Sequence, residues 1–279
     1  MGKKNKNKKD VAKAGIKILK SGKVKFSKDH KIDLSTFVNE SVENSIVSRL
    51  DGIISKEDVI IDMDEVNRKV RTSLMSEYLI ASSDYVINSS VTKTIVIPVN
   101  KKRVLKCFDF LDDGIIGSLL RTSTFASIYK KLKNDWKDLC KNDASNISNV
   151  LFVPKVMVLL YDGNGKVREI PFYVNVLIVA VPPTKYIEND TIEEVTDDEL
   201  CKRYVNDMLE SAIKCGCKDV IINPFSEKAL TNDVSNTSTV WADFISSQRY
   251  KENFNSISFS TEDQNLFIVF NTQLNKIGE

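Results

Sequence analysis

The stretch from Val153 to Pro183, VPKVMVLLYDGNGKVREIPFYVNVLIVAVPP, constrains the fold more than any other part of the chain. Two apolar runs flank the tetrapeptide Asp-Gly-Asn-Gly at 162–165, whose residue types suit the tight turn of a β-hairpin. The second run, from Tyr173 to Val181, is almost wholly apolar, as in a strand that is covered on both faces. The sequence therefore predicts a hairpin whose second strand lies inside a sheet.

Strand and helix patterns surround this hairpin. The segment VTKTIVIPVN (91–100) is rich in β-branched residues and predicts a central strand, followed by a loop-like region to Gly117. Apolar residues then recur at steps of three and four, which predicts one helix from about Ser118 to Cys140. Nearer the N-terminus the signals are mixed. We expect helices at 12–19 and 40–50, and a short strand with a helix entry at 58–66.

The C-terminal third continues the alternation. Thr196 and Glu199 form a capping-box pattern ahead of a helix that Gly216 ends, and this helix leads into a strand at 220–222. A polar loop and a helix at about 234–250 follow, and the segments SISFSTE and NLFIVFN have strand character. One α/β domain spanning residues 11–279 is the simplest account of this order.

Composition narrows the function. The chain of 279 residues is 42% hydrophobic and has no apolar run of the roughly 18 residues that a membrane helix needs, nor a secretory leader. We therefore expect an intracellular protein, cytoplasmic or nuclear, without membrane contact. Five scattered cysteines and one histidine, His30, argue against a metal site, a disulfide framework and histidine-based catalysis. No cofactor is indicated.

The first ten residues, MGKKNKNKKD, carry five lysines, and without them acidic residues outnumber basic ones. We expect residues 1–10 to form a disordered basic tail. The tail is either simply solvated or contacts nucleic acid or another anionic surface.

Three segments in matching order resemble the microbial-type poly(ADP-ribose) glycohydrolase family. They are the hairpin segment at 152–183, RTSTFASIYKKL at 121–132, and AIKCGCKDVIINPFSEKALTND at 212–233. The resemblance implies an α/β macrodomain-like fold, with a mixed central sheet, helices on both faces and an N-terminal helical extension. It also implies a site for ADP-ribose.

The catalytic motif of that family is degenerate here. When the motif is aligned on Arg121 and Ser123, its three consecutive glycines fall on the residues 105–107, and its two catalytic glutamates fall on Ile116 and Gly117. Glycines allow backbone amides to approach a pyrophosphate, and paired carboxylates supply the acid and the charge stabilisation for glycoside cleavage. Asp112 and Asp113 are weak substitutes, because Asp-Asp-Gly is also an ordinary turn.

The second glycine-rich loop of the family is also altered. Its glycines fall on polar or charged residues, whereas an aromatic and an amide position match. The resemblance assigns ligand contacts to Phe225, Ser226, Lys228, Asn232 and Arg121. The alternatives are a solvated loop, a core role for Phe225, and an ion pair of Arg121 at a helix start.

The leading hypothesis is a catalytically inactive, glycohydrolase-like pseudoenzyme that acts as a binding or interaction module. Its partners would be ADP-ribose or a related nucleotide, bound weakly, and a protein. One alternative is an active hydrolase of ADP-ribose or a related nucleotide with a relocated acid. Another is a structural scaffold.

Overall fold

The computed structural model describes residues 2–26, 31–53, 71–72, 93–142, 147–161, 164–182, 185–188, 191–194, 196–224, 233–260 and 264–275. Its helices are α1 (Gly2–Ser21), α2 (Leu34–Glu43), the 3₁₀ helix η1 (Leu50–Gly52), α4 (Lys101–Leu105), α5 (Gly114–Thr122), α6 (Phe125–Asn142), α7 (Asp197–Lys214), α8 (Val234–Ser246), α9 (Gln248–Asn253) and α10 (Gln264–Asn275). Its strands are β1 (Lys23–Lys25), β2 (Lys31–Asp33), β3 (Ile46–Arg49), β4 (Arg71–Thr72), β5 (Thr94–Asn100), β6 (Asn149–Leu160), β7 (Val167–Val181), β8 (Lys185–Glu188), β9 (Thr191–Glu194), β10 (Asp219–Ile222) and β11 (Ser256–Phe259). The expected strand and helix entry at 58–66 lie outside the described residues.

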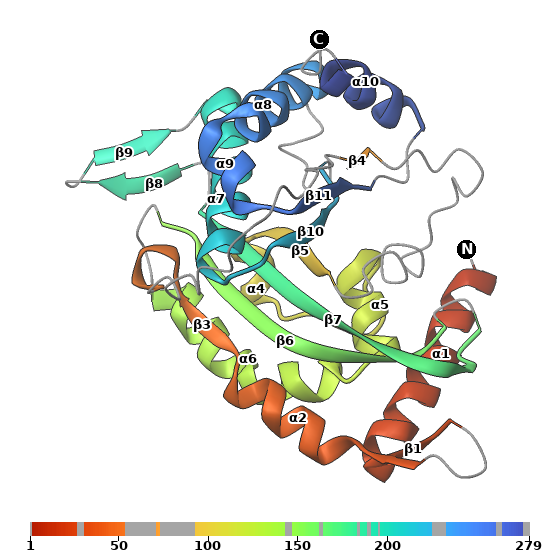
Figure 1. Cartoon of the computed structure of the whole chain (residues 1–279). Helices are drawn as coiled ribbons and strands as arrows, with labels where there is room; N and C mark the ends of the chain where they lie inside the picture. The colour runs from red at the N-terminus through yellow and green to blue at the C-terminus, as the bar shows by residue number, and fades with distance from the viewer. Residues whose placement is uncertain are drawn as a thin grey trace.

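A seven-stranded mixed sheet in the order β3-β6-β7-β5-β10-β11-β4 forms the centre of the molecule (Figure 1). β6 and β7 pair antiparallel, so the predicted hairpin is confirmed, and β7 lies between β6 and β5 as expected. β5 is the middle strand of the sheet and is parallel to both of its neighbours, β7 and β10. The sheet therefore has the mixed topology that the sequence analysis predicts.

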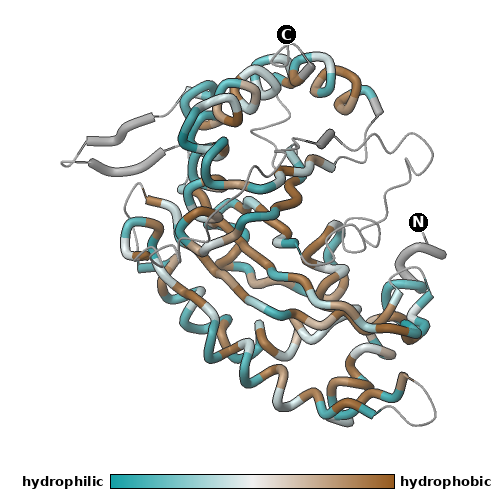
Figure 2. The backbone as a smooth tube through the Cα atoms, in the orientation of Figure 1, coloured by the Kyte–Doolittle hydropathy of each residue, from teal (hydrophilic) through white to brown (hydrophobic). Residues whose placement is uncertain are grey.

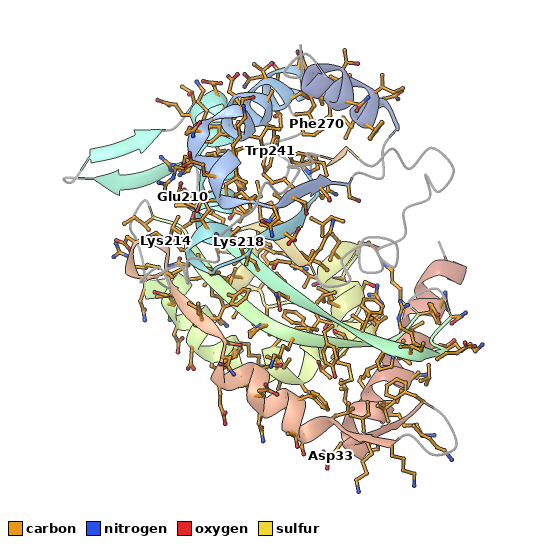
Figure 3. The ribbon with its side chains drawn as sticks, viewed as in Figure 1. Asp33, Glu210, Lys214, Lys218, Trp241 and Phe270 are labelled. Carbon is orange, nitrogen blue, oxygen red and sulfur yellow. The ribbon has the colours of Figure 1, made fainter. Side chains whose placement is uncertain are left out.

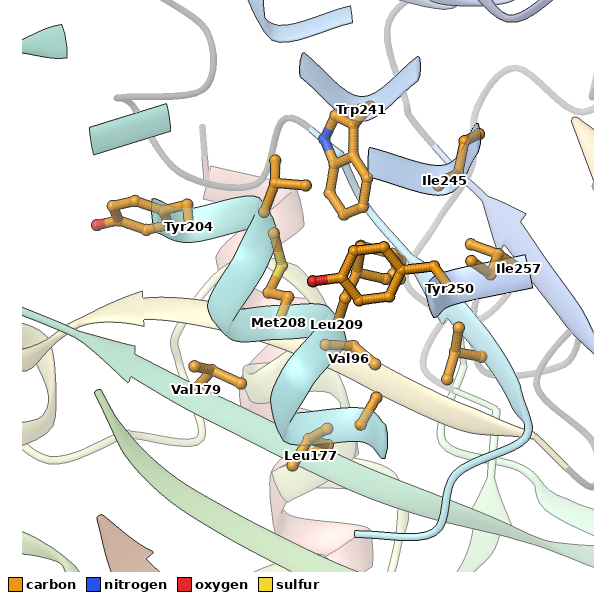
Figure 4. Packing of buried hydrophobic residues seen from close by; sticks show 14 of the residues in the cluster. Val96, Leu177, Val179, Tyr204, Met208, Leu209, Trp241, Ile245, Tyr250 and Ile257 are labelled. Carbon is orange, nitrogen blue, oxygen red and sulfur yellow. The ribbon is translucent and has the colours of Figure 1, made fainter. Parts of the chain in front are cut away.

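Helices cover both faces of the sheet, and an apolar cluster lies beneath each layer. On one face α7, α8, α9 and α10 pack over side chains such as Val96, Val179 and Val220. Figure 4 shows part of this cluster, with Val96 and Val179 beneath Met208 and Leu209 of α7. On the other face α2, α4, α5 and α6 pack over the alternate residues, such as Ile95 and Ile178. Hydrophobic residues, drawn in brown, recur along the central strands, whereas hydrophilic residues are frequent on the surrounding helices (Figure 2). No helix in the described part of the chain is both long and apolar enough to span a bilayer.

The ends of α7 follow the predicted local chemistry. The Thr196 side chain accepts a hydrogen bond from the backbone N–H of Glu199, and the Glu199 carboxylate accepts one from the backbone N–H of Thr196. This reciprocal capping satisfies two of the free amides at the helix start. Gly216 takes a φ of 70° directly after the helix, a conformation that glycine adopts without steric strain. The helix from 197 to 214 is therefore confirmed.

The single helix expected from Ser118 to Cys140 is wrong, because the chain breaks into α5 and α6 at Ser123 and Thr124. The backbone N–H of Thr124 donates to the carbonyl of Met157 at 2.9 Å, and its hydroxyl accepts from the N–H of Met157 at 2.9 Å. These bonds to β6 replace the helical ones. The apolar period continues across the break because both helices face the same sheet.

Two other expected elements differ from the structure. The helix expected at 40–50 ends at Glu43, and residues 46–49 instead form β3, whose β-branched Ile46 and Val47 pair with β6. The helix expected at 234–250 is interrupted at Ser247, whose hydroxyl donates to the carbonyl of Phe244 at 2.8 Å. A serine that bonds back to the preceding turn competes with the continuing helix.

The strand expected in NLFIVFN is also wrong, because this segment lies in α10. Phe270, labelled in Figure 3, is 2% exposed. Its ring packs edge-on against Phe259 of β11, with ring centroids 4.8 Å apart. Leu274, one helical turn later, is also buried, and Leu266, one turn earlier, packs on the same cluster. The spacing of four residues is that of a helix face.

Residues 2–10, which were expected to belong to a disordered tail, form the first turns of α1, which begins at Gly2. Val11, Ala12 and Gly15 are buried where the helix packs beside α5. The first, charged turns of α1 precede turns that pack against α5 through apolar contacts. Tertiary packing of one face, rather than local composition, explains the helix.

The packing of α10 can be tested by substitutions two residues apart. Phe270→Ala should lower the free energy of unfolding by about 3–5 kcal/mol, because it empties a buried aromatic position. Ile268→Ala should change it by less than about 0.5 kcal/mol, because Ile268 is 53% exposed. Urea denaturation of both variants checks this. Equal losses would indicate a strand, in which residues 268 and 270 share one face.

Candidate functional site

The carboxyl ends of four parallel strands meet at one edge of the sheet. Asn100, the last residue of β5, is level with Val181, the last residue of β7, whereas β10 and β11 end together beside the middle of β5. The connection from β5 to β7 packs on one face, and the helices after β10 pack on the other. Neighbouring loops therefore diverge between β5 and β10. Ligands of open α/β sheets bind at such a point.

The loop after β10 has the predicted order of strand, loop and helix. Asn223 and Pro224 leave the strand, and Asp233 caps α8 by accepting from the backbone N–H of Asn236 at 2.9 Å. The predicted ligand-binding residues of this loop lie outside the described residues. They are Phe225, Ser226, Lys228 and Asn232. Their roles stay predictions.

The loop after β5 passes through α4 and a tight segment at 106–113. Cys107 stands where the resemblance places the last of the three family glycines, and its φ is 61°, in the left-handed region. Its backbone N–H donates to the carbonyl of Val104 at 2.9 Å. A residue with a side chain pays a strain of the order of 1 kcal/mol there, which glycine avoids. The backbone thus takes a glycine-like course although the glycine is absent.

Hydrogen bonds between its own residues hold the segment from Asp109 to Asp112 in a turn. The Asp112 carboxylate accepts from the backbone N–H of Asp109 at 2.8 Å and forms an ion pair with Arg103. The Asp109 carboxylate accepts from the backbone N–H of Leu111 at 2.8 Å. The carboxylate of Asp113 pairs with Lys8 of α1. Both weak substitutes for the family's acids are therefore engaged in ion pairs.

The two positions aligned with the catalytic glutamates lie in α5 and are buried. Ile116 is 9% exposed and belongs to the apolar cluster of its face. Gly117 lies so close to the preceding loop that an added Cβ would stand 2.0 Å from the carbonyl oxygen of Asp112 and 3.0 Å from Nη1 of Arg121. Because the nearer contact is with backbone, a side chain at 117 would require the loop itself to move.

Arg121 of α5 holds the segment at 106–113 in place by hydrogen bonds. It is 2% exposed, and its Nη1 donates to the carbonyl oxygens of Phe110 at 2.6 Å and of Asp112 at 2.9 Å. The predicted ligand contact of Arg121 is untested, but these bonds give its buried charge protein partners. The phenol of Tyr129 lies against the same loop and accepts from the N–H of Phe108 at 3.4 Å. Burial raises the pKa of Tyr129 to about 12, so the phenol stays neutral at physiological pH.

A cavity that sequence reasoning missed lies beside α7. It has a volume of 590 Å³ and is flanked by η1, by Ile147 and Ser148 just before β6, and by Phe244 of α8. Figure 3 labels two of its α7 side chains, Glu210 and Lys214. Basic and acidic groups line it together, so no single charge dominates. Its α7 residues are Lys202, Arg203, Asn206, Asp207, Glu210 and Lys214. It lies beside β6 and β3, away from the junction of β5 and β10.

Two carboxyls of this cavity have opposite environments. Asp207 is 8% exposed and accepts from the hydroxyl of Ser148 at 2.5 Å, and burial raises its pKa above the ordinary value. Glu210 accepts two hydrogen bonds from the Arg249 guanidinium at 2.5 Å each, which lower its pKa. In the described part of the chain, no three His, Cys, Asp or Glu residues are grouped as metal ligands would be.

Comparison with known proteins identifies the fold. The sequence matches no family model and no curated protein. The structure is similar to the crystal structure of poly(ADP-ribose) glycohydrolase from Thermomonospora curvata, with a TM-score of 0.66 and 15% identity over 95% of this chain and 98% of that one. The same enzyme bound to the inhibitor ADP-HPD gives a TM-score of 0.63 at 14% identity, with the same coverage. The enzyme from Deinococcus radiodurans in complex with ADP-ribose gives 0.53 at 10% identity, over 86% of this chain and 97% of that one.

The chain therefore has the macrodomain-like fold of the microbial poly(ADP-ribose) glycohydrolases, as the resemblance implies. The likeness covers 95% of this chain. At this level of identity it establishes the fold, whereas activity has to be argued from the residues.

Gly117 supplies the sharpest test of the site geometry. Gly117→Ala should lower the free energy of unfolding by about 2–4 kcal/mol, because the new methyl group meets the Asp112 carbonyl. Ser118→Ala, one residue further along the same helix, is the matched control. The Ser118 hydroxyl is buried without a hydrogen-bond partner among the described residues, so its loss should change stability by less than about 1 kcal/mol. A fully stable Gly117→Ala protein would contradict the packing.

The two cavity carboxyls predict opposite pKa shifts in one NMR titration. The pKa of Asp207 should lie above 3.8 and that of Glu210 below 4.5. Ser148→Ala should raise the pKa of Asp207 further, because it removes a donor to the ionised form. The folded state then binds the Asp207 proton more tightly than the unfolded chain does, so this group lowers stability as pH rises from 3.8 through the raised pKa. An Asp207 pKa at or below 3.8 would contradict the burial.

Proposed function

We propose that this protein is a catalytically inactive relative of the poly(ADP-ribose) glycohydrolases that acts as a binding or interaction module. The observation that carries the proposal is the packing of Gly117 against the Asp112 carbonyl. In the family's motif this position holds a catalytic glutamate, and here the fold leaves no space for a side chain. On this proposal, the lack of catalysis follows from the packing around Gly117 as well as from the absence of the glutamates.

The size of the missing contribution favours inactivity. A positioned general acid typically contributes about 10²–10⁴-fold, and stabilisation of developing charge contributes a comparable factor. Asp112 and Asp113 are the nearest carboxylates in sequence, but Arg103 and Lys8 pair with them. An active hydrolase with a relocated acid would have to break these ion pairs to bring a protonated carboxyl to the leaving oxygen.

The ligand that we propose for this module is ADP-ribose or a related nucleotide, bound weakly between the ends of β5 and β10. Solved structures with this fold hold ADP-ribose or the inhibitor ADP-HPD. Leu105, Lys106 and Cys107 replace glycines, which fills space and keeps backbone amides from a pyrophosphate. Binding would then depend on the loop after β10, through the charge of Lys228 and the ring of Phe225.

A protein partner is the second part of the proposed role. An inactive module with this fold can act by binding a ligand or by binding other proteins. A scaffold would bind proteins and no nucleotide. The nucleotide experiment below separates the first possibility from the last. Contact of the basic N-terminal segment with nucleic acid is an independent proposal.

Purified full-length protein should release no ADP-ribose from poly(ADP-ribose) above background, and titration calorimetry should show ADP-ribose binding weaker than about 1 μM. Lys228→Ala and Phe225→Ala should each weaken this binding roughly tenfold, since each removes a charged or stacked contact worth about 1–3 kcal/mol. Lys251→Ala, which removes an exposed lysine of α9, should leave it unchanged.

Three results would each contradict a part of the proposal. Turnover that is abolished by the double substitution Asp112→Ala/Asp113→Ala would establish a relocated acid and an active enzyme. Submicromolar affinity that survives both Lys228→Ala and Phe225→Ala would place the ligand elsewhere. Absence of any heat with ADP-ribose would remove the nucleotide and favour the scaffold role.

A further inference from the structure

Helix α1 carries a stripe of lysines along one side. Lys9, Lys13, Lys17 and Lys20 follow one another at steps of four, four and three residues, and all four are exposed. Residues at these steps lie above one another on a helix. The stripe is therefore continuous over about 16 Å at a rise of 1.5 Å per residue.

The opposite side of α1 is fixed to the body of the protein. Val11 is 1% exposed and Ala12 is 6% exposed. Gly15 approaches α5 so closely that an added Cβ would stand 2.2 Å from the carbonyl oxygen of Arg121. α1 lies beside α5 and the end of the β6–β7 hairpin (Figure 1). Because the buried residues face these elements and the four lysines are exposed, the lysine stripe lies on the solvent side of α1. The helix has no apolar face left for insertion into a bilayer.

The β1–β2 hairpin extends the same charge. Lys23 and Lys25 are exposed on either side of the buried Val24, and Lys31 of β2 lies directly opposite Lys25. Like charges in directly opposed positions destabilise a sheet. The hairpin is found next to Asp33, at the lower end of the molecule in Figure 3. A folded protein keeps such a pair at an energetic cost, which suggests an anionic partner.

Few acidic groups offset these seven lysines. In the parts of the chain that are described, none of the seven forms an ion pair. The acidic residues at 7–26 and in β2 are Asp10 and Asp33, and Asp33 lies opposite Lys23 in the hairpin. The Asp33 carboxylate also caps α2 by accepting from the backbone N–H of Ser35 at 2.9 Å. We call the seven lysines the lysine ridge: Lys9, Lys13, Lys17, Lys20, Lys23, Lys25 and Lys31.

We propose that the lysine ridge binds the phosphate backbone of duplex nucleic acid without sequence preference. Its helical part is as long as about five phosphates along one strand, at 3.4 Å each. Between residues 7 and 26 and in β2, the one aromatic side chain described is the half-buried Phe26, so a platform for stacking unpaired bases is missing. An exposed row of lysines with few aromatic neighbours suits a duplex, whose bases are already stacked. This proposal does not rest on the nucleotide site.

The test is fluorescence anisotropy of the full chain with a labelled mixed-sequence DNA duplex of about 20 base pairs, at several salt concentrations. The wild type should bind at low salt and weaken steeply as salt rises, because lysine contacts release counterions. The variant Lys9→Gln/Lys13→Gln/Lys17→Gln/Lys20→Gln should lose at least about tenfold in affinity at low salt. Its slope of log K against log salt should fall by about 3–4, at 0.9 per phosphate contact. Glutamine matches lysine in helix propensity, so the melting temperature should hold.

The matched control removes the same charge elsewhere. Lys130→Gln/Lys141→Gln/Lys218→Gln/Lys251→Gln neutralises four exposed lysines on α6, α9 and the start of β10. This control should stay within about threefold of wild-type affinity, as expected when only long-range charge is lost. Equal losses in the two variants would overturn the ridge, because net charge alone would explain them. No binding at low salt, tighter binding to a single strand of the same sequence, or binding to anionic vesicles but not to the duplex would each overturn the proposal.

Discussion

The buried guanidinium of Arg121 organises the part of the molecule on which both proposals depend. It donates to the carbonyl oxygens of Phe110 and Asp112 and so draws the loop after β5 onto α5. The loop can come this close because position 117 is glycine, and α1 can rest on the carbonyl of Arg121 because position 15 is glycine. One helix thus packs against the loop after β5 at Gly117, the position aligned with a family glutamate, and against α1 at its Arg121 carbonyl.

The sheet edge and the loop after β5 play different parts in the proposed function. The sheet still brings the ends of β5 and β10 together, which is the part of the architecture that makes a ligand site. The loop after β5 forms a turn whose polar groups are satisfied internally through Asp109, Asp112 and Arg103. Under the proposed function, a ligand would bind at this edge without being cleaved.

The sequence correctly predicted the elements that depend on residues close together in the chain, such as turn and capping residues. The hairpin of β6 and β7 follows from its turn residues, and α7 follows from the Thr196–Glu199 pair and Gly216. Elements that depend on contacts between residues far apart in the sequence were predicted wrongly or not at all. The break before α6 depends on Met157, and α10 is a helix because Phe270 packs on Phe259. The cavity beside α7 joins segments far apart in the sequence. Alignment with the family showed that a glutamate is absent at position 117, but only the contact with Asp112 shows why no side chain fits.

Hydrogen exchange of the loop tests the closed arrangement around Arg121 most directly. The backbone amides of Asp109, Leu111 and Asp112 donate within the turn, so we expect them to exchange slowly in the wild type. In Arg121→Met they should exchange at least about tenfold faster, whereas amides of β7 should be unchanged, since the loss of two hydrogen bonds to a charged group is local. Fast exchange of the loop in the wild type, or equal protection in both proteins, would show that Arg121 does not hold the loop closed.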